Sequence, residues 1–420
     1  MSKSKLNQVA KSWIAYDMGN SAFATTVLGA FFPLFFSSYW AGGMDEITIT
    51  KNYTAGLTII NVIILIMMPI IGAITDVRSL TKTFFILFTC ISSLTVGSFY
   101  FIDYGQWILA LSLYGIALFC FAASLVLYDK ILLFVSSNED VTKISGYGYA
   151  FGYLGGGILF VINSFMVLNP SFFGLPSGSE GVVLATKWSF VSVTVWWLIF
   201  SMPIFIFYKQ LPFETEGSFS DALRQIFSTF RHISENKNIA LFLLAFFFYI
   251  DAVHTIMQLA AMFGDGIGID QSSIIYALIL VQFVAFPATL FWSYFGSRYG
   301  DKNVIYLTIF VYLFALVFSS TLNNATDFFI LAFFVGSIQG GIQASSRSLF
   351  AKLIPEDKAG ELFGFYNTFG RAVSVLGPLL INIFLSYSND LKVALIPLAI
   401  IFLIGLVPVS YTHLTLPTKA

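Results

Sequence analysis

Long apolar segments alternate with short polar breaks along the whole chain. The segments are roughly 20 residues long, which is the length of a helix that crosses the hydrocarbon core of a bilayer. Nearly uncharged runs of this kind predict membrane-spanning helices. The pattern predicts twelve spans, at residues 13–40, 53–74, 84–102, 107–127, 145–168, 187–208, 239–262, 272–295, 304–322, 327–349, 360–386 and 392–409.

The one sizeable polar connection, at residues 209–238, divides the predicted spans into six and six. Apolar residues from Phe219 to Ile233 recur at helical spacing and share this segment with Lys and Arg. We therefore expect an amphipathic helix on the cytoplasmic membrane surface. The predicted units are an N-terminal six-helix bundle at 1–208, this linker, a C-terminal six-helix bundle at 239–409, and a tail at 410–420 that resembles translated adapter sequence and is expected to be non-native.

Composition agrees with a membrane protein. Hydrophobic residues make up 57% of the chain and charged residues only 10%, whereas a soluble domain is about a quarter charged. The net charge of −1 gives no sign of a nucleic-acid partner. Cys90 and Cys120 fall inside apolar segments and match no metal-ligand spacing, so we expect neither a metal nor a cofactor.

The distribution of basic residues predicts the orientation. An even number of spans puts both termini on one side of the membrane. The N-terminus and the loops on its side hold most of the Lys and Arg residues, whereas the opposite loops hold only Lys51, Lys187 and Lys392. The positive-inside rule therefore places both termini in the cytoplasm. Short loops favour the inner, cytoplasmic membrane of a bacterial cell, with a eukaryotic vacuole as the alternative, and we expect a monomer.

Two stretches of sequence occur twice. Asn-Glu-Asp at 138–140 precedes a stretch rich in glycine and tyrosine at 146–152, and Pro-Glu-Asp at 355–357 precedes a similar stretch at 364–370. Positions 146 and 364 are 218 residues apart, and six predicted spans separate the copies. Because six is even, both copies cross the membrane in the same direction. This parallel repeat predicts a substrate site near the midplane, between the two halves.

The loops after the second and eighth spans resemble the gating loop of the major facilitator superfamily, an Asp-Arg-x-Gly-x-Lys-like run. The first copy keeps Asp76, with Arg78 displaced by one position. The second keeps Arg298 and Lys302, while Ser297 replaces the acid. The resemblance implies that Asp76, Arg78, Arg298 and Lys302 act in gating on the cytoplasmic side.

Two further segments, at 13–27 and 249–255, resemble the first-span and seventh-span signatures of the vacuole-effluxer-like branch of that superfamily. The resemblance extends over essentially the whole chain. It implies an all-α membrane protein with the major facilitator fold, in which twelve transmembrane helices form two pseudo-symmetric six-helix bundles. It also implies transport of a small solute, and amino acids moved outward are a candidate because eukaryotic members are linked to amino-acid release from the vacuole.

Ionisable side chains inside the spans are the first functional candidates, because burying them in hydrocarbon is costly. Asp251, His254 and Gln258 share one face of the seventh span, and Arg371 lies at a similar depth in the eleventh, with Asn367 one turn before it. We hypothesise that Asp251 and Arg371 face a common cavity as charge partners or a substrate clamp. A substrate carboxylate that bound the Arg371 guanidinium would release the Asp251 carboxylate, which could then bind a proton. Competition for Arg371 would in this way couple proton binding to solute binding. A structural ion pair between two helices is the alternative.

The first span carries a second candidate group. Asp17 lies about one turn inside it, and Asn20 continues the same face. These residues either bind substrate or gate the cytoplasmic mouth, and the sequence favours neither. Glycines in the fifth and tenth spans, by contrast, favour close helix approach over ligand contact.

A polytopic enzyme or flippase acting on a lipid-linked substrate is the alternative function. An enzyme of this kind needs a nucleophile, a base or a metal cluster at the bilayer face. The three histidines, His232, His254 and His413, are scattered, so catalysis is disfavoured. A scaffold or receptor is disfavoured by the repeat and by the charges predicted within the membrane. The partners that we expect are the lipid bilayer, a small-molecule substrate and protons.

Overall fold

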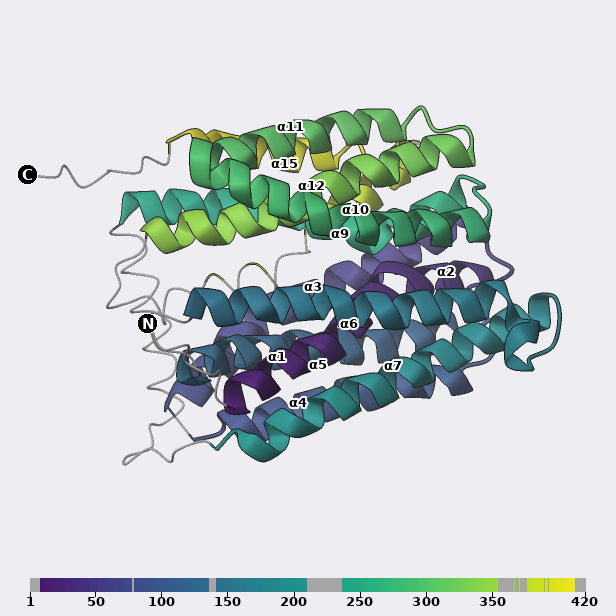
Figure 1. The fold of residues 1–420 in the computed structure, drawn as a ribbon. Coiled ribbons are helices and arrows are strands. Elements are labelled where there is room, and N and C mark those ends of the chain that lie inside the picture. Colours follow the sequence, from purple (N-terminus) through teal and green to yellow (C-terminus); the bar gives the residue numbers. More distant parts are fainter. Residues whose placement is uncertain are drawn as a thin grey trace, which may run out of the picture.

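The computed structural model describes residues 8–77, 79–135, 141–209, 236–353, 366, 370, 376–388, 390–391 and 393–411. Within them the regular structure is helical, and twelve helices lie side by side in two groups (Figure 1). The first six helices form one group and the last six form the other. The N-terminal helices are the purple to teal ribbons and the C-terminal helices the green to yellow ones.

The first helix is continuous and has four segments: α1 (Gln8–Ala22), η1 (Phe23–Phe31), α2 (Phe32–Phe35) and η2 (Phe36–Trp40). The rest of the N-terminal half comprises α3 (Glu46–Val77), α4 (Thr81–Ser98), η3 (Phe99–Phe101), α5 (Trp107–Val135), α6 (Val141–Leu168), η4 (Pro170–Phe173) and α7 (Ser179–Phe207). The C-terminal half comprises α9 (Lys237–Gly266), α10 (Gln271–Tyr299), α11 (Asp301–Ser319), α12 (Ala325–Leu353), α14 (Leu376–Ser388) and α15 (Leu398–Tyr411).

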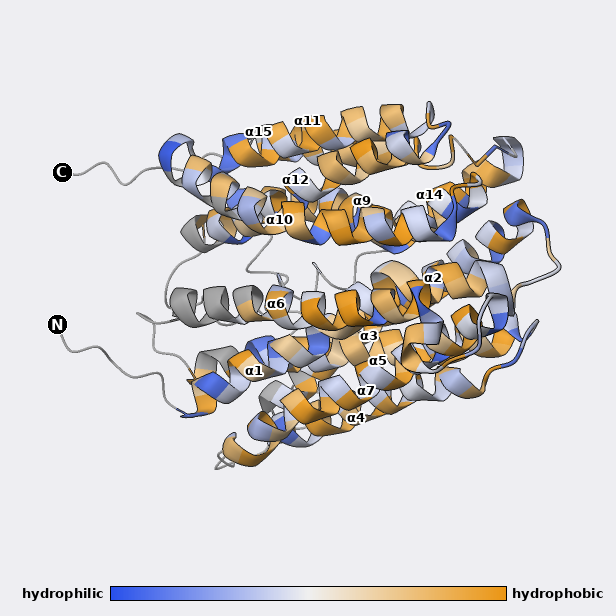
Figure 2. Ribbon diagram, turned by 45° about the vertical axis from the view of Figure 1, so that its right-hand side comes forward, coloured by the Kyte–Doolittle hydropathy of each residue, from blue (hydrophilic) through white to orange (hydrophobic). Residues whose placement is uncertain are grey.

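Ten of the described helices are long and apolar enough to cross a membrane. Two shorter apolar helices, at Leu376–Ser388 and Leu398–Val409, occupy the places of the eleventh and twelfth spans. Large apolar side chains such as Ile66, Leu94 and Val317 are exposed on the outside, and Figure 2 shows apolar residues along most of each helix. An outer surface of this kind faces lipid. The prediction of an all-α membrane protein with twelve helices is confirmed.

Several helices begin before the apolar run that predicted them. Helix α3 starts at Glu46 and α7 at Ser179, seven and eight positions before the expected spans at 53–74 and 187–208. For α3 the reason is that a side-chain cap, not hydropathy, decides where the helix starts. The backbone N–H of Thr48 donates to Asp45 Oδ1 (3.0 Å), which caps α3.

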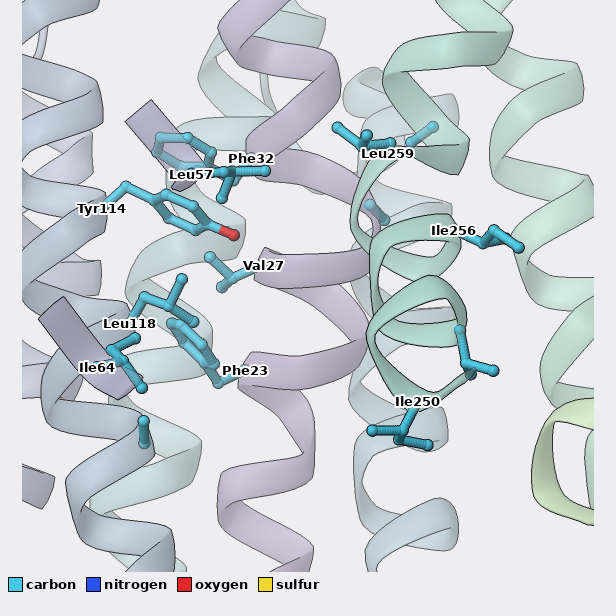
Figure 3. Close-up of a cluster of buried hydrophobic side chains, with 14 of the residues drawn as sticks. Phe23, Val27, Phe32, Leu57, Ile64, Tyr114, Leu118, Ile250, Ile256 and Leu259 are labelled. Carbon is cyan, nitrogen blue, oxygen red and sulfur yellow. The ribbon is translucent and has the colours of Figure 1, made fainter. Parts of the chain in front are cut away.

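The first span is wider than an ordinary α-helix over part of its length. Segments η1 and η2 are π-helical, and at the end of η1 the N–H of Phe32 donates to the carbonyl of Val27, five residues earlier. Pro33 has no N–H, which interrupts the usual ladder of helical hydrogen bonds at this point. Figure 3 shows side chains of this span among those of neighbouring helices, and the ring of Phe32 stacks on Tyr114 of α5 with centroids 3.9 Å apart.

Glycines let helices approach closely in both halves, as predicted. A Cβ atom at Gly156 of α6 would lie 2.9 Å from the Ser21 carbonyl oxygen of α1. A Cβ atom at Gly340 of α12 would lie 1.7 Å from Thr289 Oγ1 of α10. Gly157 differs, because a Cβ atom there would meet nothing within 4 Å.

The predicted amphipathic linker helix falls mainly on 210–235, outside the described residues. Helix α15 runs to Tyr411, and the remainder of the expected tail, at 412–420, is also outside them. The division into the four predicted units therefore stays a prediction.

Candidate functional site

A cavity of about 240 Å³ lies between the two halves. Helix α1, segment η1 and helix α6 line it from the N-terminal half, and helices α9, α10, α11 and α12 line it from the C-terminal half. Its volume is just below the range of roughly 300–1,000 Å³ that is usual for small-molecule sites. The cavity therefore suits a small solute rather than a large one.

Each half contributes polar groups to this wall. The N-terminal half contributes the hydroxyl groups of Ser21, Thr25 and Tyr153. The C-terminal half contributes the hydroxyl group of Ser319 and the side-chain amides of Gln282, Gln339 and Gln343. Amides both donate and accept hydrogen bonds, so this wall can orient a polar solute. Most of the other lining residues are apolar.

Asp251, the first predicted site residue, is fully buried in α9. Its carboxylate accepts hydrogen bonds from two backbone N–H groups of α14, from Leu376 (3.1 Å) and from Gly377 (2.7 Å). In this geometry Asp251 joins α14 to α9.

The other predicted residues of α9 lie near the same face. His254 is half-buried and Gln258 is 6% exposed. The residues by which α9 lines the cavity are Ile256, Met257, Ala260 and Phe263. Arg371 and Asn367 lie outside the described residues, so their proximity to Asp251 stays a prediction.

Of the two predicted residues on the first span, Asp17 lies against α6 and Asn20 is buried. A Cβ atom at Gly152 of α6, which lines the cavity, would lie 3.2 Å from Asp17 Oδ2 and 2.7 Å from Ser21 Oγ. Asp17 is therefore adjacent to the cavity wall. Asn20 is 3% exposed and is not among the residues that line the cavity.

Polar contacts that the sequence did not reveal join the two halves. They lie toward the end of the bundle where the first span finishes and α3 begins, which we call the far end. Ser37 of η2 donates to the carboxylate of Asp265 of α9. Asn382 Nδ2 of α14 donates to the carbonyl of Lys51 (2.8 Å) and to Thr54 Oγ1 (3.2 Å) of α3.

The predicted gating loops lie toward the opposite end. Asp76 is in the last turn of α3, and Arg78 lies outside the described residues. In the second copy, the Arg298 guanidinium lies 5.6 Å from the ring centre of Tyr299, and the Lys302 ammonium lies 5.9 Å from that of Tyr306.

Two further polar contacts at that end went unnoticed in the sequence. Lys130 Nζ of α5 donates to the carbonyl of Thr75 at the end of α3 (2.5 Å). Ser348 Oγ of α12 donates to Asp301 Oδ2 at the start of α11 (2.9 Å). Positions 130 and 348 are 218 apart (348 − 130 = 218), the offset of the sequence repeat, but their partners at 75 and 301 are 226 apart (301 − 75 = 226). The repeat therefore does not predict these contacts.

The described residues contain no group of three or more His, Cys, Asp or Glu side chains placed to hold a metal ion.

Comparison with known proteins decides the family. The model of the family described as "Vacuole effluxer Atg22 like" matches residues 5–415. The chain belongs to this Atg22-like family.

Relatives of the Atg22-like chain include bacterial and yeast proteins. The Bacillus subtilis protein "Uncharacterized MFS-type transporter YxiO" is 33% identical over 407 residues, which is 95% of this chain and 94% of that protein. "Autophagy-related protein 22" of Vanderwaltozyma polyspora is 26% identical over 61% of this chain and 54% of its own length. The match therefore spans about half of that yeast protein.

Solved transporters share the fold at low sequence identity. The D-xylose-proton symporter aligns over 98% of both chains with a TM-score of 0.67 and 10% identity. A mutant form of the nucleoside transporter NupG aligns over 97% of this chain and 99% of its own, with a TM-score of 0.61 and 16% identity. The Atg22-like chain is thus a multi-pass membrane transporter of the major facilitator superfamily, and not an enzyme, with the bilayer and a small-molecule substrate as its partners.

Proposed function

We propose that this protein is a secondary active transporter that moves a small solute by alternating access and couples the movement to protons. Amino acids moved outward are the first candidate cargo, by analogy with the effluxer relatives. A flippase acting on a lipid-linked substrate is the second candidate and is an outcome of the test below.

One structural observation carries the proposal. A cavity lined by both halves lies beside an interface in which the halves are hydrogen-bonded toward one end. Helix α3 packs against α14 and helix α9 against η1 and α2 in that interface. Alternating access requires a site between two bodies that separate at one end at a time.

The bias in basic residues supports an orientation with both termini in the cytoplasm. The far end then faces away from the cytoplasm, and the cavity is closed on that side. Similarity to a Bacillus protein supports the cell membrane as the location, and a monomer has all the elements of the cavity.

Within this proposal, two sets of residues act in binding and coupling. Asp251, His254, Gln258, Asn367 and Arg371 belong to the first set. Asp17 and Asn20 on the first span belong to the second. Asp17 adjoins the cavity wall through Gly152, whereas Asp251 acts through the position of α14. The loop residues Asp76, Arg78, Arg298 and Lys302 act in gating.

The test is proton flux in liposomes that contain the full chain and a pH-sensitive dye. Pools of amino acids, peptides and sugars are added in turn to native protein, to Asp251→Asn and to Asp17→Asn. Protein-free liposomes and a protonophore serve as controls, and size-exclusion profiles of the variants establish that they are folded.

A proton flux that depends on one pool supports coupled transport, and its loss in one folded variant assigns coupling to that residue. An unchanged flux in both variants would remove both from the coupling mechanism. If no pool gives a flux, and labelled lipid crosses the bilayer only when the protein is present, the flippase replaces the transporter of soluble solutes.

A further inference from the structure

The far-end contact between Ser37 and Asp265 places a carboxyl group in the interface between the two halves. Asp265 is the penultimate residue of α9 and is half-buried, and Ser37 belongs to η2 at the end of the first span. The described hydrogen-bond partner of the Asp265 carboxyl group is one neutral hydroxyl, that of Ser37. Asp265 therefore differs from Asp251, which is held by two backbone N–H groups within the C-terminal half.

No cation neutralises this carboxyl among the residues that the structure describes. The charged groups that the structure describes toward the far end are Asp45, Glu46 and Lys51 at the start of α3, Asp103 before α5, Glu180 and Lys187 of α7, Asp270 before α10, Asp327 of α12, and Asp390 after α14. Lys187 lies over the ring of Tyr39 in η2 and pairs with Asp103 (3.7 Å). None of these charged groups forms an ion pair with Asp265 within the described part of the chain. Lys51 takes part in the interface through its backbone carbonyl, which accepts from Asn382.

The hydrogen bonds of Ser37 favour a neutral partner. Ser37 Oγ also donates to the carbonyl of Leu34 (3.0 Å). A hydroxyl has one hydrogen to donate and two lone pairs to accept with. If Asp265 is ionised, this one hydrogen must serve both the carboxylate and the Leu34 carbonyl. If Asp265 is protonated, its O–H donates to Ser37 Oγ, and Ser37 still donates to Leu34.

We infer that Asp265 is a proton-binding residue of the far-end gate, which takes up a proton when this end closes and releases it when it opens. The proton comes from, and returns to, the water on the far side, and no other bond changes. Closure removes the carboxyl from water, which costs free energy if the group is charged. Opening hydrates it and removes that cost. The inference rests on the proposed alternating-access function and adds a second proton site to it.

The test follows the far-end distance directly rather than transport. Spin labels are attached to Phe101→Cys of the N-terminal half and Tyr387→Cys of the C-terminal half, both of which are highly exposed residues near the far end. The native cysteines are replaced by Cys90→Ser and Cys120→Ala. Distances between the labels are measured by pulsed electron paramagnetic resonance of the full chain in liposomes, across a series of pH values.

The native protein is expected to shift from short to long distances as the pH rises, with the ratio of the two populations changing by up to about tenfold per pH unit for one linked proton. Asp265→Asn mimics the neutral carboxyl and is expected to keep the short distance at every pH. Asp390→Asn removes an exposed carboxylate near the same end and is the matched control, which should keep the native pH dependence. Asp265→Glu should restore it, and so guards against a folding defect.

An unchanged pH dependence in Asp265→Asn, or no pH dependence in the native protein, would overturn the inference. Either result leaves transport untouched if the liposome flux is present. Conversely, a pH-dependent distance between the labels, together with no proton flux from any solute pool, would support the role of Asp265 and contradict the proposed coupled transport.

Discussion

Asp251 on α9 accepts a hydrogen bond from the backbone N–H of Gly377 on α14, with the carboxylate oxygen 2.7 Å from the nitrogen. The N–H of Leu376 donates to the other oxygen of the same carboxylate, at 3.1 Å. The side chain of Asp251 is fully buried on α9, so both hydrogen bonds are shielded from water. A residue that the sequence marked as a coupling candidate thus also holds two helices together.

Removal of this acceptor should destabilise the protein. Asp251→Ala leaves two buried N–H groups without the carboxylate, at a cost of roughly 1–3 kcal/mol for each group. Asp251→Asn keeps one carbonyl oxygen and should lose less. Thermal unfolding in detergent measures the difference. An Asp251→Ala melting temperature equal to that of the native protein would show that the contact does not stabilise α14.

Close packing of α10 on α12 should tolerate no side chain at Gly340. A Cβ atom there would lie 1.7 Å from Thr289 Oγ1, and overpacking of this kind typically costs about 1–3 kcal/mol. Gly340→Ala is expected to lower the melting temperature, and Thr289→Ala in the same chain to restore part of it. Gly157→Ala is the control, because its Cβ atom meets nothing within 4 Å. Equal effects of the two alanines would contradict the packing argument.

The side chain of Asn382 should bias the far end toward closure. Asn382→Ala removes both hydrogen bonds to α3, each worth about 0.5–1.5 kcal/mol. The population with a long distance between labels at 101 and 387 should then rise about fivefold or more. Asn52→Ala, which removes an amide near the same end whose contact with Met44 stays within the N-terminal half, should leave the distances unchanged. A shift of equal size in both variants would refute a specific role for Asn382.

The cap of α10 should make stability depend on acid pH. Hydrogen bonds from Ser273, the backbone N–H first, lower the pKa of Asp270. Because the pKa is lower in the folded state than in the unfolded state, the contribution is present above about pH 4 and is lost as the pH falls through the folded-state pKa. The melting temperature of native protein should therefore fall toward that of Asp270→Ala in this range. A difference between the two that stays constant down to the most acidic pH would contradict the capping account.

The sequence predicted the number of helices because each span is a long apolar run, and such runs are unmistakable. Helix starts such as Glu46 could not be read from hydropathy, because a single hydrogen bond to Asp45 sets the boundary. The π-helical path of the first span was also missed, since Pro33 alone does not distinguish a kink from a widened helix.

The candidate site was harder to predict than the fold. Buried charge identified Asp251, but the sequence could not show that its described partners include two backbone N–H groups of another helix. Asp265 escaped attention because it stands at the end of an apolar run, where an acid is ordinary, and only the packing of the two halves makes its position unusual. Local periodicity in a sequence does not show which distant segments will be in contact.

Asn382 binds the main chain at position 51, not the lysine side chain that stands there. Any amino acid presents the same carbonyl oxygen. Substitutions at position 51 should therefore leave this contact between the halves intact, whereas substitutions at position 382 should break it. Among relatives, we expect the residue at 51 to vary and the amide at 382 to be retained.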